Sequence, residues 1–230
     1  MISDMNKINV YIGYDQRESV AFRVLSYSIL KHASLPVNII PINLYNLRKF
    51  YKRKKGPKDS TDFSISRFLT PYLSAFKGYS VFMDCDFIIN GDIAEVINKA
   101  KKDSSKAVWC VKHSYIPKNK RKFLNEKQLA YRKKNWSSFM VFNNKKCKKL
   151  TLKLVEKSNG LFLHQFKWLK SDKLIGSLPA KWNVLVGEQK VPKNFKALHY
   201  TIGGPYFKKF KKCKGSNIWF KYKNEMMRPL

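Results

Sequence analysis

The segment Ser80–Asp92 reads SVFMDCDFIINGD, an apolar run that ends in two aspartates one residue apart. An uninterrupted apolar run of this kind predicts a buried strand. Side chains at positions i and i+2 of an extended backbone lie on the same side, so the carboxylates of Asp84 and Asp86 can face one point. Two carboxylates that close in an apolar setting repel each other unless a cation lies between them. Because oxygen ligands suit Mg²⁺ or Mn²⁺, the pattern predicts a divalent metal site.

The same aspartates have a simpler interpretation. Aspartates after a strand often cap a turn or the start of a helix, and an isolated Asp-x-Asp tripeptide is common. The distribution of acidic residues favours a metal site, because the chain has only 15 of them and four fall within twelve positions. These four are Asp84, Asp86, Asp92 and Glu95.

Apolar and amphipathic segments alternate along the amino-terminal half of the chain. This order predicts an α/β fold whose mostly parallel sheet carries helices on both faces. The segment Asp15–Glu18 fits a capping box that starts the first helix. In such sheets ligands bind beyond the carboxyl ends of the strands, and Asp15 and the Asp84/Asp86 pair all come where strands end. The expected strands are Ile8–Tyr14, Val37–Leu44, Ala107–Val111 and Phe139–Asn143, and the expected helices are Asp15–His32, Asp62–Phe76, Asp92–Ala100 and Lys149–Lys157.

The composition gives one domain, alone or with a tail, and an extreme positive charge. The 230 residues are 44% apolar, enough for a sizeable core, and the formal net charge is +32 from 47 basic and 15 acidic residues. Such a charge invites a nucleic-acid partner. However, 39 of the basic residues are lysine and only 8 are arginine, the residue that suits forked recognition of phosphates and bases. The charge is also spread along the chain, and no helix-turn-helix, zinc-finger or aromatic RNA-binding signature occurs, so nucleic acid is an unlikely primary partner.

Cysteine usage and hydropathy favour a cytoplasmic protein. The four cysteines, Cys85, Cys110, Cys147 and Cys213, are widely spaced and form no Cys-x-x-Cys pair, which is typical of reduced thiols. The first expected strand has no charged-then-apolar leader before it, and no apolar run reaches the roughly 18 residues of a membrane span. We therefore expect a cytoplasmic protein whose membrane contact, if it has any, is peripheral.

Five short motifs occur in a recognisable order. They are Tyr11–Asp15 (YIGYD), Ser64–Phe68 (SISRF), Phe82–Asp86 (FMDCD), Asn135–Ser138 (NWSS) and His199–Pro205 (HYTIGGP). The series resembles glycosyltransferases of the GT-A fold, closest to the family 8 type that includes glycogenin and bacterial lipopolysaccharide galactosyltransferases.

The resemblance implies both a fold and a reaction. The fold is a Rossmann-like, mixed and mostly parallel sheet in a single catalytic domain over residues 1–207, followed by a basic tail or helix over 208–230. The reaction is transfer of a sugar from a nucleotide-sugar, usually a UDP-sugar, to a glycan, glycolipid or protein acceptor. A bound Mn²⁺ (or Mg²⁺) bridges the two phosphates of the donor.

The resemblance implies a complete set of metal ligands. Asp84 and Asp86 match the family's Asp-x-Asp, and His199 matches the histidine that completes the set. A mixed carboxylate and imidazole set leans toward Mn²⁺. Taken alone, His199 is better interpreted as a packed histidine beside Tyr200, but the Gly203–Pro205 segment that follows favours a ligand.

Further residues are implied to bind the nucleotide-sugar. Arg67 lies where similar enzymes place an arginine on the donor, although a surface ion pair is the alternative. Asp15 matches the uracil-binding segment and can also be a helix N-cap. The family's phosphate lysine is displaced by one position here, because Phe207 occupies its place and Lys208 follows. The implied set is Ile12, Gly13, Asp15, Arg67, Asp84, Cys85, Ser137, Ser138, Gly203, Gly204 and Lys208.

The residues at the reacting carbon are less clear. Trp136–Ser138 stands where the family usually has Asn-Ala-Gly in contact with the donor sugar, so the identity of that sugar stays open. By their distance from the Trp182-Asn183 pair, His164 and Gln165 are the nearest matches to the family's Asp-Gln pair, and Asp172 is a further catalytic candidate. His164 can equally be a core residue. Retention of configuration is only weakly favoured.

The positive charge suggests a role for the basic segments, and two alternatives to a glycosyltransferase function stay open. The basic segments 48–58 and 118–134 are expected to be mobile and either to close over the donor or to hold an anionic acceptor. The densest basic patches are Lys52–Lys55 and Lys208–Lys214. These patches can contact an anionic membrane or a polyanion, or they can be solvated loops. One alternative function is a polyanion- or nucleic-acid-binding protein on a degenerate scaffold of this kind. Another is a nucleotidyltransferase, which ranks lower because Gly13–Arg17 offers only one glycine for a triphosphate loop.

Overall fold

The structure contains both strands and helices, and its last described element is a helix. The computed structural model describes residues 7–57, 59–118, 121–126 and 130–228. The strands are β1 (Ile8–Gly13), β2 (Val37–Ile42), β3 (Tyr79–Met83), β4 (Phe87–Ile89), β5 (Val108–Cys110), β6 (Phe139–Asn143), β7 (Ile175–Ser177), β8 (Val184–Leu185) and β9 (Ala197–His199). The α-helices are α1 (Ser19–His32), α2 (Leu44–Leu47), α3 (Thr70–Leu73), α4 (Ala94–Lys102), α5 (Leu152–Lys157), α6 (Gly160–His164) and α7 (Ser216–Met226).

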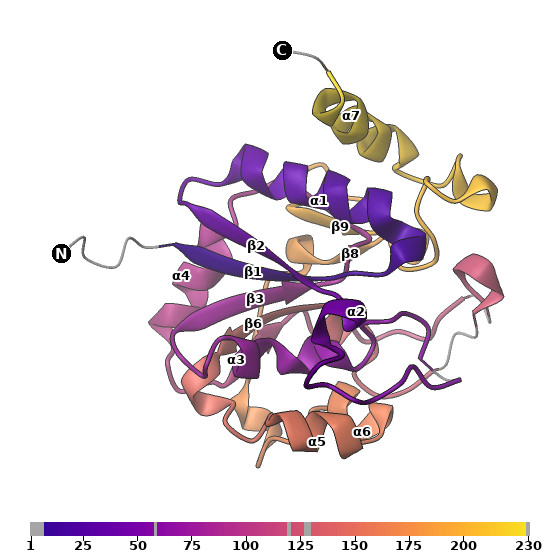
Figure 1. The fold of residues 1–230 in the computed structure, drawn as a ribbon. Helices are drawn as coiled ribbons and strands as arrows, with labels where there is room; N and C mark the ends of the chain where they lie inside the picture. The colour runs from indigo at the N-terminus through magenta and orange to yellow at the C-terminus, as the bar shows by residue number, and fades with distance from the viewer. Residues whose placement is uncertain (1–6, 58, 119–120, 127–129, 229–230) are drawn as a thin grey trace.

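The main sheet is mixed, as expected for the fold. Six strands lie in the order β2-β1-β3-β6-β5-β7. β1 pairs in parallel with β2 and β3, and β5 pairs in parallel with β7, whereas β6 runs antiparallel to both its neighbours. Helices cover both faces, with α1 on one side and α3, α5 and α6 on the other (Figure 1). The α/β fold class predicted from the sequence is therefore confirmed.

A second, smaller sheet places the acidic pair. Its three strands lie in the order β4-β9-β8. The apolar run Ser80–Ile89 does not form one strand: β3 ends at Met83 in the main sheet, the chain turns through Asp84–Asp86, and β4 continues in the small sheet. The two aspartates therefore lie in the connection between two sheets, and a turn, rather than a continuous extended strand, brings their side chains together.

The helix expected at Asp62–Phe76 is shorter and less regular than predicted. The structure has a short 3-10 turn at Ser66–Leu69 followed by the four residues of α3. Pro71 lies in the first turn of α3, where its missing N–H cannot donate back into the 3-10 turn, so the two elements do not join into one α-helix. Ala75 and Phe76 then adopt left-handed backbone angles, with φ of 49° and 55°, which end the helix.

The carboxyl-terminal helix forms an outer layer. α7 packs on α1, which itself covers the sheets (Figure 1). Trp219 and Tyr222 of α7 are buried and share an apolar cluster with Val24 of α1. Residues 216–226 are thus part of the packed structure, whereas a domain boundary at residue 207 stays a prediction.

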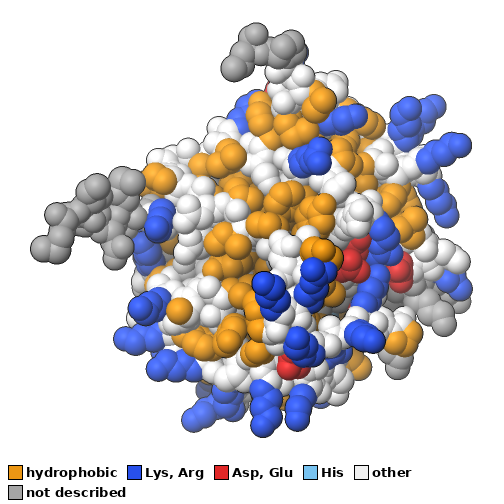
Figure 2. All heavy atoms as spheres, viewed as in Figure 1, with side chains coloured by type: hydrophobic (Ala, Val, Ile, Leu, Met, Phe, Trp, Pro, Cys, Tyr) orange, Lys and Arg blue, Asp and Glu red, His pale blue; other side chains and the backbone are white. Residues whose placement is uncertain are grey.

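Basic side chains do not gather in one patch on the face of the molecule that Figure 2 shows. Lysine and arginine side chains are scattered over that face and around its edge, with few acidic side chains between them (Figure 2). No helix in the described part of the chain combines the length and the apolar character that crossing a bilayer needs.

Candidate active site

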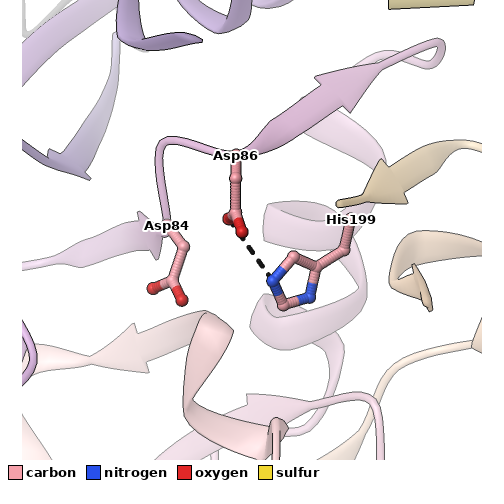
Figure 3. A group of neighbouring side chains, drawn as sticks. All are labelled: Asp84, Asp86 and His199. Carbon is pink, nitrogen blue, oxygen red and sulfur yellow. Dashed lines mark ion pairs between the residues drawn. The ribbon is translucent and has the colours of Figure 1, made fainter. Parts of the chain in front are cut away.

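Pairing of the small sheet's strands brings the predicted metal ligands together. In the antiparallel β4–β9 pair, Phe87 is opposite His199, and the backbone N–H of Tyr200 donates to the carbonyl of Asp86 over 2.9 Å. One side-chain ligand atom from each of Asp84, Asp86 and His199 lies within 4.8 Å of the others. Nε2 of His199 is 3.3 Å from Oδ1 of Asp86 (Figure 3). The sequence predicted this group of residues. Asp86 and His199 are 113 positions apart in the chain, and only the fold brings them close together.

Asn183 fixes the orientation of the His199 ring. Its Oδ1 lies 3.0 Å from Nδ1 of His199, and its Nδ2 donates to Oγ of Ser138 over 3.0 Å. Because the amide oxygen can only accept, Nδ1 carries a proton, and Nε2, which faces the aspartates, is the nitrogen that a metal ion would bind. The ring also stacks on Phe87, with centroids 4.2 Å apart. A histidine held by its second nitrogen in this way is typical of metal ligands.

The electrostatics of the aspartates also fit a cation. Burial raises the pKa of Asp84 to about 6, and the negative charge of Asp86 adds to this while Arg67 opposes it. Burial acts in the same direction on Asp86, but attraction to His199 outweighs it and holds the pKa of Asp86 below its usual value. Oδ1 of each aspartate is buried, and its polar neighbours are Nη1 of Arg67 at 2.7 Å for Asp84 and Nε2 of His199 at 3.3 Å for Asp86. Two carboxylates and an imidazole nitrogen that converge on one point are a donor set suited to a divalent ion.

A cavity of about 730 Å³ opens beside these residues. Its wall is formed by Asp84 and Asp86 after β3, Glu18 after β1, and Ser137 and Ser138 before β6. The cavity therefore lies beyond the carboxyl ends of β1 and β3, where ligands bind in sheets of this type.

Comparison with known proteins shows the family and the fold. No family model matches the chain. Protein CDI of Arabidopsis thaliana is 42% identical over 233 residues, which cover 97% of this chain and 88% of that protein. The chain belongs to the Protein CDI family.

Solved structures similar to this Protein CDI family member are glycosyltransferases. The galactosyltransferase LgtC, solved with donor and acceptor sugar analogs, has a TM-score of 0.60 and 9% identity, over 97% of this chain and 98% of LgtC. The glycosyltransferase GlyE of Streptococcus pneumoniae has a TM-score of 0.61 and 15% identity, and the bifunctional WbbM has 0.57 and 15%. This chain spans 61% of the GlyE chain and 52% of the WbbM chain. At these identities the likeness shows the GT-A fold.

Arg67 of this Protein CDI family member is buried beside the acidic pair. Its Nη1 lies 2.7 Å from Oδ1 of Asp84 and donates to the carbonyl of Ser137 over 3.0 Å, while Nε donates to the carbonyl of Ser64 over 3.1 Å. The alternative of a surface ion pair is therefore wrong, because only 6% of Arg67 is exposed. Its guanidinium is fixed in the cavity wall.

Ser137 and His164 form a second polar pair in the cavity wall. Nδ1 of His164 lies 2.7 Å from Oγ of Ser137. Burial lowers the pKa of His164 well below its usual value, and the nearby Arg67 adds to the effect. The imidazole is therefore neutral at physiological pH and available for hydrogen bonding to a polar ligand.

The structure does not bring Gln165, Asp172 or Lys208 to the cavity. The backbone carbonyl of Gln165 accepts from Nζ of Lys133 over 2.9 Å, and its side chain is not part of the cavity wall. The Asp172 carboxylate is 64% exposed and pairs with the same Lys133 at 2.5 Å. Lys208 faces a neighbouring hollow instead. A direct catalytic role for Gln165 or Asp172 thus has no support from this geometry.

The remaining predicted donor residues do not line the cavity. Asp15 is buried, pairs with Arg17 at 2.6 Å and accepts from the backbone N–H of Asp62 over 3.2 Å, so it holds the loop at the cavity edge. A side chain at Gly13 would collide with the Phe63 ring, so glycine is needed there for close packing. The others, which do not form the cavity wall, are Ile12, Cys85, Gly203 and Gly204. All four cysteines are free thiols.

Sequence reasoning missed Glu18. The capping box assigned it a return bond to the helix start, but Asp15 alone caps the first turn, by accepting from the N–H of Arg17. Glu18 instead lines the cavity and accepts from the Tyr206 hydroxyl over 2.5 Å. Burial, followed by the negative charge of Asp86, raises the pKa of Glu18 to about 8. Nothing in the local sequence indicates this, because Tyr206 lies 188 residues away.

Proposed function

We propose that this chain is a metal-dependent glycosyltransferase, similar to family 8, that transfers a sugar from a UDP-sugar to a glycan, glycolipid or protein acceptor. The observation that carries the proposal is the group of Asp84, Asp86 and His199 in the wall of a large cavity on a GT-A fold. A metal ion between the two carboxylates would offset their mutual repulsion, which adds to the effect of burial in raising the pKa of Asp84. Mn²⁺ suits the mixed ligand set better than Mg²⁺.

Each side chain in the wall has a role that its geometry supports. Asp84, Asp86 and His199 would hold the ion, which when bound stabilises the negative charge on the departing diphosphate. Arg67 would place a fixed positive charge beside the donor, because its guanidinium is anchored by two backbone carbonyls. The neutral pair of Ser137 and His164 offers hydrogen bonds to sugar hydroxyls.

Calorimetry with UDP and Mn²⁺ tests the proposal. We expect UDP to bind only when Mn²⁺ is present, and Asp86→Asn to lower the affinity at least about tenfold, because the substitution removes one ligand charge without changing size. Asp103→Asn is the matched control, since Asp103 is an exposed aspartate outside the cavity wall. UDP binding that is independent of metal, or equal in the wild type and Asp86→Asn, would contradict the proposal.

The same variant separates this proposal from a polyanion-binding function. A basic protein on a degenerate scaffold would bind polyanions in a salt-sensitive manner that does not depend on Asp86. Loss of UDP binding in Asp86→Asn with unchanged polyanion binding would show that the two activities use different sites.

A further inference from the structure

A second hollow adjoins the cavity. Its volume is about 660 Å³, and it lies between the turn at Arg121–Asn125 and the segment 202–210. The two segments are far apart in the sequence but neighbours in the fold (Figure 1). Lys122 is part of the wall of both the hollow and the cavity, so a molecule in the hollow would lie next to one in the cavity.

The charge of this hollow is entirely positive. Four cationic side chains and no acidic one line it: Arg121, Lys122, Lys208 and Lys209. Within the described residues none of the four forms an ion pair. Lys208 and Lys209 are exposed. The attraction for an external anion comes mainly from Arg121, Lys208 and Lys209, because Lys122 also faces the carboxylates of the cavity.

The rest of the wall is apolar and firmly built. Ile202, Leu124, Phe207 and Phe210 supply it, and Leu124 is 55% exposed. The Phe123 ring stacks on Phe207 with centroids 5.1 Å apart, and the Phe123 N–H donates to the carbonyl of Ile202 over 2.8 Å.

The turn that presents Leu124 is conformationally unusual. Leu124 and Asn125 both have left-handed backbone angles, with φ of 50° and 62°. Arg121 closes this turn by donating from Nη1 to the Asn125 carbonyl over 2.8 Å. A non-glycine residue in this region is held there by its surroundings, and such positions cluster at binding sites.

We propose that this hollow binds the acceptor of the transfer reaction and that the acceptor carries a phosphate group. The inference rests on the proposed function. The cations would bind the phosphate, the apolar wall would pack against the carbon part of the acceptor, and Lys122 places the acceptor beside the donor cavity. Lys208 then serves the acceptor phosphate rather than the donor diphosphate.

A phosphate of this kind can belong to a soluble molecule or to a lipid headgroup, and two probes distinguish them. One is glycerophosphoinositol in solution. The other is phosphatidylcholine vesicles that contain phosphatidylinositol, with pure phosphatidylcholine vesicles as reference. Binding of each probe is measured on the wild type, on Lys209→Glu and on Lys211→Glu. Both lysines are exposed and two positions apart, but only Lys209 lines the hollow.

We expect Lys209→Glu to weaken binding of at least one probe about tenfold, because it puts a negative charge beside the phosphate, and Lys211→Glu to change it much less. Lys209→Gln should give an intermediate loss. Binding of the soluble probe assigns a soluble acceptor, and binding of the vesicles alone assigns a lipid. Equal losses in the two Glu variants would overturn the inference, since they would show only general surface attraction. No loss in either would also overturn it.

UDP and Mn²⁺ isotherms on the same samples separate this inference from the proposed function. Both Glu variants should bind UDP as the wild type does. Competition between UDP and the phosphate probe would overturn the inference, because it would place the phosphate in the donor cavity. If UDP does not bind the wild type at all, the proposed function fails, and Lys209-dependent probe binding would still establish the hollow as a phosphate site.

Discussion

Glu18 shows how one buried side chain links the cavity to the stability of the fold. Its pKa in the folded protein is about 8, above the usual 4.5, because it is buried near Asp86. Between pH 4.5 and 8, Glu18 is therefore protonated in the folded protein and ionised in the unfolded chain. In this window stability falls as pH rises, by at most about 1.4 kcal/mol per pH unit from this group. Below pH 4.5 the group has no such effect.

The variant Glu18→Gln tests this coupling. Glutamine keeps the shape and can still accept from Tyr206, but it does not titrate. We expect the free energy of unfolding of the variant to fall less steeply than that of the wild type between pH 5 and 8, and the variant to be the more stable protein at pH 8. Urea denaturation with a chelator present, at several pH values, measures both slopes. Parallel pH profiles would mean that Glu18 is ionised in the folded protein.

At the scale of elements, the outer helix α7 contributes to stability. The Trp219 side chain is 2% exposed and packs in the cluster that joins α7 to α1. Trp219→Ala should lower the free energy of unfolding by about 3–5 kcal/mol, because it leaves a large apolar cavity. Met227, just after α7, is 67% exposed, and Met227→Ala should change stability by less than about 0.5 kcal/mol. Thermal denaturation compares the two, and a Trp219→Ala protein as stable as wild type would show that α7 is not docked.

Elements with strong local patterns were predictable, and those that depend on distant contacts were not. The alternation of β1, α1 and β2 follows from periodicity and short connections, so its prediction is confirmed. The helix at Asp62–Phe76 was predicted too long and too regular, because its apolar spacing was weighed without Pro71. The β4–β9 pair has no local signature, since β9 follows β4 by more than 100 residues. The position of His199 beside Asp86 was therefore reached only through the resemblance, and Glu18 was missed altogether.

The net charge of +32 has a consequence for the whole molecule. Basic side chains are spread over the visible face and edge with few acidic partners, so they repel one another in the compact state more than in the expanded unfolded chain (Figure 2). Salt screens this repulsion over about 10 Å at 0.1 M ionic strength. We therefore expect the melting temperature to rise when sodium chloride is increased from low to physiological concentration. Differential scanning fluorimetry measures the change, with sucrose as a control that does not screen charge. A melting temperature that falls with salt would show that the ion pairs of the surface, such as Lys31–Glu225 and Lys196–Glu95, outweigh the repulsion among its lysines.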